Sequence, residues 1–143
     1  MINDSNPLVI SGGTVRAEAR EYLSKADLIL AIGTEMAETD NYVGKYSING
    51  KIVRIDIDDK KIDDNYKATV GLVGDAKETV KKLNAKLNNS VSLEQLESVK
   101  NAVIEIKRKI DANLTKSEKR HKKLLTILRK ITSSETILSL IHI

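Results

Sequence analysis

The chain has 143 residues, enough for one domain of ordinary size, and 41% of them are hydrophobic although Phe and Trp are absent. The lack of Cys excludes disulfides, thiolate metal sites and a cysteine nucleophile, and two His are too few for a histidine-rich metal cluster. With no apolar run of membrane-spanning length, no signal-peptide pattern at the N-terminus and a net charge of only +4, we expect a soluble cytoplasmic protein.

The N-terminal part predicts a turn, a helix and a buried strand. Gly12 and Gly13 are a turn signal, and Thr14 is the candidate N-cap of a helix over residues 15–24. The run Leu28–Ile32 is wholly apolar and ends at Gly33. Such a run is typical of a parallel-sheet strand that is covered on both faces.

Two further strands are predicted at residues 51–58 (KIVRIDID) and 68–75 (ATVGLVGD). Asp75 is expected to cap a helix over residues 76–87, whose buried stripe would be Ala76, Val80, Leu83 and Leu87. The pattern predicts a three-layer α/β fold with a parallel sheet. In such sheets ligands bind beyond the carboxyl ends of the strands, so Gly33 marks a candidate site.

The polar residues at these strand ends have simple explanations. Gly33 and Thr34 could present N–H groups to a phosphate, but without a complete GxGxxG pattern the residues alone favour a plain strand end. Asp56 and Asp58 come at the end of the predicted strand, and we do not expect them to form a paired-carboxylate active site. We expect Asp58 to cap a turn, whereas an acid at the strand end could bind a ribose hydroxyl.

Other polar side chains are also interpreted as structural. We expect the acids Glu35, Glu38 and Asp40 to form a solvated loop, with weak cation binding as the alternative. Tyr66 is expected to pack rather than react. His121 lies among lysines and arginines on a predicted helix, and a solvated face is favoured over a nucleic-acid patch because no aromatic residue is available for stacking.

The C-terminal part predicts two helices. Ser92 is a candidate cap for a long helix that ends at Asn113, and a second helix is expected over residues 116–130. The first helix has an apolar stripe that needs a partner surface: Leu93, Leu96, Val99, Val103, Ile106 and Ile110.

Three motifs in this order, ADLILAIGT, KIVRIDID followed by KKIDDNY, and ATVGLVGDAKETV, resemble the central domain of thiamine-diphosphate-dependent enzymes. That family includes acetolactate synthases and 2-oxo acid decarboxylases. The resemblance covers residues 7–87, and GTEMAETD is similar to the decarboxylase or acetolactate-synthase-like members. It implies a Rossmann-like, incomplete parallel sheet followed by C-terminal helices.

The resemblance also implies how the chain is organised. We expect residues 1–89 to form a partial central domain, 90–115 a linker helix and 116–137 the start of the C-terminal cofactor-binding domain. The strand, helix and strand that normally open the central domain are not found, so we expect a fragment truncated at both ends. Residues 138–143 (LSLIHI) resemble a sequencing-adapter translation, and we hypothesise an assembly artefact there.

For function, the resemblance implies thiamine diphosphate and Mg²⁺ in the parent enzyme, where the cofactor attacks a 2-oxo carbon and carbon dioxide leaves. The family's activating glutamate and its Gly-Asp-Gly…Asn motif belong to other domains, so we assign this chain no catalytic residue and no metal ligand. The expected partners are those missing domains, in a homodimer or homotetramer, with no nucleic acid and no membrane.

The resemblance carries a nucleotide groove over to eight positions: Gly33, Thr34, Glu35, Asp56, Ile57, Gly74, Asp75 and Ala76. Flavin-binding relatives tend to have Arg at the position of Glu35, and a carboxylate there would repel a pyrophosphate. We therefore expect an empty or ADP-like groove rather than FAD. The alternatives are a free-standing ADP-, NAD- or FAD-type module, a helical interaction protein built on residues 92–131, and debris of a truncated gene.

Overall fold

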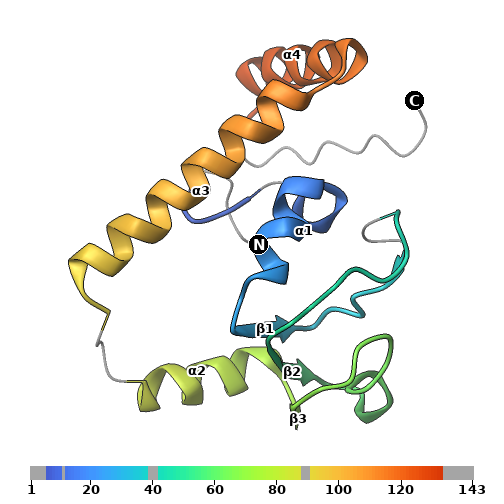
Figure 1. The fold of residues 1–143 in the computed structure, drawn as a ribbon, viewed down its shortest axis with the longest axis vertical. Helices are drawn as coiled ribbons and strands as arrows, with labels where there is room; N and C mark the ends of the chain where they lie inside the picture. The colour runs from blue at the N-terminus through green and yellow to red at the C-terminus, as the bar shows by residue number, and fades with distance from the viewer. Residues whose placement is uncertain (1–5, 11, 39–41, 88–90, 134–143) are drawn as a thin grey trace. The chain divides into compact units, whose positions relative to one another are not determined.

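The computed structural model describes residues 6–10, 12–38, 42–87 and 91–133 (Figure 1). The chain divides into two compact units, Met1–Lys109 and Ile110–Ile143. The elements are, in order, η1 (Gly13–Val15), α1 (Ala17–Ser24), β1 (Leu28–Ile32), β2 (Lys51–Asp56), η3 (Asp59–Lys61), β3 (Val70–Val73), α2 (Ala76–Lys86), α3 (Leu93–Asn113) and α4 (Lys116–Ile131). Asp40 and the tail 138–143 lie outside the described residues.

The three strands form one parallel sheet, as predicted, and their order in it is β1-β2-β3. The register pairs Ala31 with Arg54 and Arg54 with Gly71, so the middle of β2 is flanked on both sides. Two backbone bonds extend the ladders past the strand ends: Gly33 N donates to Ile55 O at 2.8 Å, and Gly74 N donates to Asp56 O at 2.8 Å. All three carboxyl ends therefore meet at one edge of the sheet.

The prediction that β1 is covered on both faces is wrong. Only Ala31 in this strand is buried, whereas Leu28, Leu30 and Ile32 are 54%, 43% and 39% exposed. Because side chains alternate along a strand, these three share one face of the sheet. The helix α2 packs against β2, the central strand, and this face of β1 stays open to solvent.

The predicted start of the first helix is also wrong. Gly12 and Gly13 have φ of 79° and 44°, and the chain then makes the 3-10 turn η1 before Arg16 returns to extended backbone. α1 therefore begins at Ala17, and Thr14 is not its cap. Arg20 fastens the turn to the helix, because its Nη1 donates to Thr14 O at 2.7 Å and to Val15 O at 2.9 Å.

The predicted caps of the later helices are confirmed. The Asp75 side chain accepts from Glu78 N at 2.9 Å at the start of α2. Ser92 Oγ accepts from Gln95 N at 3.1 Å before α3. These side chains satisfy backbone donors that have no partner inside the helix.

The predicted apolar stripes are buried only in part. In α3 the buried members are Val103, Ile106 and Ile110, whereas Leu93 is 82% exposed. No residue of the α2 stripe is fully buried, because α2 contacts mainly the single strand β2. The packed core is therefore centred on β2, where Ile52 and Ile55 are 6% and 1% exposed.

Gly71 makes space for a side chain that lies across the sheet. A Cβ at this position would lie 2.3 Å from Ile62 Cγ2, much closer than real carbon atoms approach. We predict that Gly71→Ala lowers the free energy of unfolding by about 1–3 kcal/mol, as overpacking does in other cores. Urea denaturation measures this difference.

Two variants control that measurement. Lys67→Ala, in the exposed loop before β3, introduces no such overlap and should unfold at the wild-type urea concentration. The double variant Gly71→Ala with Ile62→Ala should recover part of the loss, because the overlapping methyl is gone. A Gly71→Ala protein as stable as wild type would show that Ile62 does not pack over β3.

Candidate functional site

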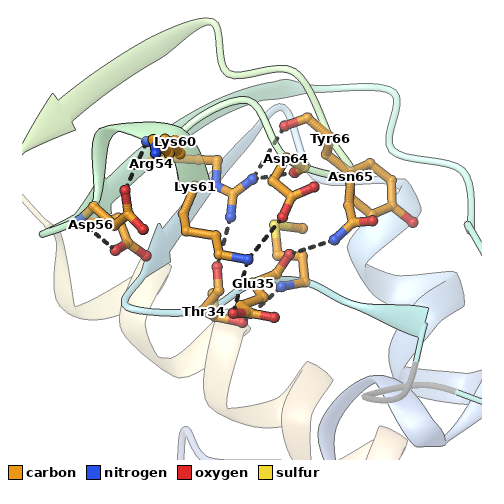
Figure 2. A network of polar contacts seen from close by, with 11 residues as sticks. Thr34, Glu35, Arg54, Asp56, Lys60, Lys61, Asp64, Asn65 and Tyr66 are labelled. Carbon is orange, nitrogen blue, oxygen red and sulfur yellow. Dashed lines mark hydrogen bonds and ion pairs between the residues drawn. The ribbon is translucent and has the colours of Figure 1, made fainter.

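A buried arginine on β2 lies at the centre of a polar network (Figure 2). The Arg54 side chain is 1% exposed, and its guanidinium donates only to backbone carbonyls. Nη2 donates to Thr34 O at 2.7 Å, and Nη1 donates to Asp64 O at 2.5 Å and to Tyr66 O at 3.4 Å. One side chain thus ties the loop after β1 and the segment after η3 to the central strand.

Lys61 bridges two carboxylates beside this arginine. Its Nζ lies 3.1 Å from Glu35 Oε1 and 3.2 Å from Asp64 Oδ2. The hydrogen bonds to Glu35 and then to Asp64 raise the pKa of Lys61, so its ammonium stays charged. The same ammonium lowers the pKa of Asp64, and Arg54 adds a smaller contribution in the same direction.

Asn65 and Tyr66 complete the network. Asn65 Nδ2 donates to Glu35 O at 3.1 Å, and Asn65 has a φ of 59°, a left-handed conformation that Asn tolerates better than most residues. Tyr66 packs as predicted: its ring centroid lies 5.6 Å from that of Tyr46, its hydroxyl accepts from Tyr46 N at 2.8 Å and donates to Tyr46 O at 3.2 Å.

The structure brings the eight predicted groove residues to the same edge of the sheet, at the carboxyl ends of β1, β2 and β3. Several of their polar groups already have internal partners. The N–H groups of Gly33 and Gly74 are used in sheet bonds, and the Asp75 carboxylate caps α2. Ile57 is 75% exposed. The nucleotide groove itself stays a prediction.

Asp56 and Asp58 form a turn rather than a catalytic pair. Asp56 Oδ1 accepts from Asp58 N at 3.0 Å, and Asp58 Oδ1 accepts from Lys60 N at 3.0 Å at the start of η3. The predicted capping role of Asp58 is confirmed. Of the predicted solvated acids, Glu35 and Glu38 are exposed, but Glu35 also pairs with Lys61.

A cavity of about 380 Å³ lies beside the end of β1. It is mostly apolar, with two threonine side chains and one tyrosine, and it has no charged residue in its wall. Its lining residues are Thr14, Ile29, Leu30, Ala31, Thr34, Met36, Ala37 and Tyr46. Thr34 and its carbonyl thus connect this cavity with the arginine network.

The described residues offer no metal centre. Within residues 6–10, 12–38, 42–87 and 91–133, no group of three or more His, Asp or Glu side chains could hold a metal ion. In the same ranges, no helix combines the length and the apolar character needed to cross a bilayer. His121 is exposed on α4, as predicted.

Sequence reasoning missed the centre of this site. Arg54 is a single charged residue inside the apolar run of KIVRIDID, and a cation in the central strand of a parallel sheet is a signal of buried hydrogen bonding. Nothing in the nearby sequence indicates that Lys61 pairs with Glu35, because the two residues are brought together only when the sheet folds.

Residues 1–83 match the family model described as "Thiamine pyrophosphate enzyme, central domain". A probable 2-ketoarginine decarboxylase AruI of Pseudomonas aeruginosa is 40% identical over 81 residues, which are 57% of this chain and 14% of that protein. The acetolactate synthase large subunit of Haemophilus influenzae is 36% identical over 72 residues, 50% of this chain and 13% of that protein.

A sulfoacetaldehyde acetyltransferase of Roseovarius nubinhibens is 36% identical over 75 residues, covering 49% of this chain and 12% of that protein. The chain thus spans 12–14% of the length of these three relatives. All three matches agree with the family resemblance that the sequence motifs indicated.

The ion pair between Lys61 and Asp64 makes a pH-dependent contribution to the stability of the fold. Because the pKa of Asp64 is lowered in the folded chain, its stabilising effect is full above the ordinary Asp value of 3.8 and is lost as pH falls through the lower folded value. We predict that Lys61→Met raises the pKa of Asp64 toward 3.8. An NMR titration of the Asp64 carboxyl carbon measures the change.

Lys60→Met is the matched control. Lys60 lies on the same turn, but only its backbone N–H takes part in the described hydrogen bonds. This variant should leave the pKa of Asp64 unchanged. Identical Asp64 titrations in wild type and Lys61→Met would mean that the ion pair is not formed in solution.

Proposed function

Because the chain belongs to the thiamine pyrophosphate enzyme central-domain family, we propose that it is the non-catalytic central scaffold of a thiamine-diphosphate-dependent 2-oxo acid decarboxylase or acetolactate-synthase-like carboligase. The family match over residues 1–83, on a parallel sheet, carries the proposal. A probable 2-ketoarginine decarboxylase and an acetolactate synthase among its relatives favour this choice of reactions.

The described residues do not themselves fit the cofactor and its metal. Thiamine diphosphate is bound in proteins through a metal ion that oxygen ligands hold, and the described part of the chain presents no such cluster. Several of the polar groups at the sheet edge are paired with one another instead. We therefore place cofactor binding in other domains of the enzyme, and give this chain the task of supporting them.

The open face of β1 is consistent with a scaffold. Leu28, Leu30 and Ile32 expose apolar surface that a lone domain would normally cover. In this proposal such surface is available to neighbouring parts of the enzyme. We expect a homodimer or homotetramer, as in the resembling family.

A test uses native material and the recombinant chain together. Protein captured from the source cells with an antibody against α3 should release carbon dioxide from 2-ketoarginine or pyruvate only when thiamine diphosphate and Mg²⁺ are added. The recombinant chain alone should release none, since no cofactor site is expected in it. Carbon dioxide release by the recombinant chain alone would contradict the proposal. So would its release by the captured native protein without added thiamine diphosphate and Mg²⁺.

The position of the eight predicted groove residues at one edge of the sheet favours a second candidate, a nucleotide-binding module of ADP, NAD or FAD type. Its site would be those eight residues, with Gly33 at the end of β1. The Glu35 carboxylate would repel a diphosphate at close range, although Lys61 offsets part of its charge. A ligand that binds only the folded chain raises its melting temperature, so the absence of any shift at millimolar ADP, NAD and FAD would remove this candidate.

A further inference from the structure

The segment of residues 59–66, here called the strap, lies against the loop that follows β1 and is held there by two different sets of contacts (Figure 2). The first set, the anchor, is buried: Arg54 binds the carbonyls of Asp64 and Tyr66. The Tyr66 hydroxyl adds two hydrogen bonds to the backbone of Tyr46.

The second set, the latch, consists of polar contacts to Glu35. Lys61 Nζ lies 3.1 Å from the carboxylate, and Asn65 Nδ2 donates to the Glu35 carbonyl. The side chains of Lys61 and Glu35 are 34% and 59% exposed, whereas Arg54 is 1% exposed. Water and salt reach the latch but not the guanidinium of the anchor.

This difference in burial makes the two sets unequal in strength. Exposed ion pairs contribute little because water screens them, whereas a buried charged donor that loses its acceptors is costly. Native proteins open locally where contacts are few and exposed. The strap therefore separates from β1 at the latch well before it separates from Arg54.

In the closed state the latch occupies Glu35. This residue lies three positions after Ile32, the last residue of β1, and its carboxylate and carbonyl are both held by the strap. The Thr34 carbonyl is held by Arg54. A molecule approaching the carboxylate or the carbonyl of Glu35 must displace Lys61 or Asn65.

We propose that the strap is a flap that closes over Glu35, in the loop after β1, through Lys61 and Asn65, and that opens at this latch while Arg54 keeps its base on the sheet. Opening exposes the carboxylate and the carbonyl of Glu35 and frees the Lys61 ammonium without unfolding the domain. Access to this edge then depends on ionic strength.

Hydrogen exchange of the full chain, followed amide by amide, tests the flap. The strap is reported by the amides of Lys60 and Ile62, which donate to Asp58 Oδ1 and Asp59 O, and the anchor by the Tyr46 amide, which donates to the Tyr66 hydroxyl. The sheet is reported by Thr69, whose N–H donates to Ile52 O. Lys61→Met should speed exchange of the two strap amides about two- to fivefold, because an exposed ion pair stabilises only modestly.

The same variant should leave the Tyr46 and Thr69 amides at wild-type rates. Adding 1 M salt, as a chosen condition that shortens screening to about 3 Å, should speed the strap amides in wild type but not in Lys61→Met. Lys60→Met, on the same turn and without a described ion pair, should exchange like wild type.

Three outcomes would overturn the flap. They are unchanged exchange rates of the strap amides in Lys61→Met, an equal acceleration of these amides in Lys60→Met, and faster exchange of the Tyr46 amide together with the strap amides. If Lys61→Met also accelerates Thr69, it has weakened the whole fold, and Glu35→Gln then decides. That variant removes the ion pair from the opposite side, and unchanged strap amides in it contradict the proposal.

Discussion

The buried guanidinium of Arg54 is the interaction on which the described sheet edge depends. Removing a charge from water costs several kcal/mol, and the cost is offset only where the charge is fully hydrogen bonded. Here the carbonyls of Thr34, Asp64 and Tyr66 provide that compensation. Charge-assisted bonds of this kind are stronger than neutral ones, so the arginine fixes two loops that would otherwise have only exposed contacts.

This arrangement explains why the carboxyl edge of the sheet resembles a ligand-binding site, although its contacts favour a scaffold role. Parallel strands bring their carboxyl ends together, which is where α/β folds bind ligands. In this chain the glycine N–H groups complete the sheet, Asp75 caps a helix, and Lys61 neutralises Glu35. Several polar groups of this edge are therefore already paired within the domain, which agrees with a supporting role.

The sequence predicted the three strands, their parallel arrangement and the caps Asp75 and Ser92. The strands and the caps were predictable because they depend on residues close together in the chain. Runs such as Leu28–Ile32 and caps such as Asp75 are local signals. Burial was not predictable in the same way: the exposure of Leu30 depends on which strand α2 covers. The partnership of Lys61 with Glu35 depends on tertiary structure, whereas Arg54 had a signal, a lone cation in an apolar strand, that was not used.

Urea unfolding of Arg54→Met tests the central role of this side chain most directly. The variant keeps an unbranched chain but leaves the carbonyls of Thr34 and Asp64 without their donor, so we predict a loss of about 3 kcal/mol or more in the free energy of unfolding. Arg120→Met, which removes an exposed arginine from α4, should change it little. An Arg54→Met chain as stable as wild type, with unshifted NMR signals in residues 59–66, would contradict the account.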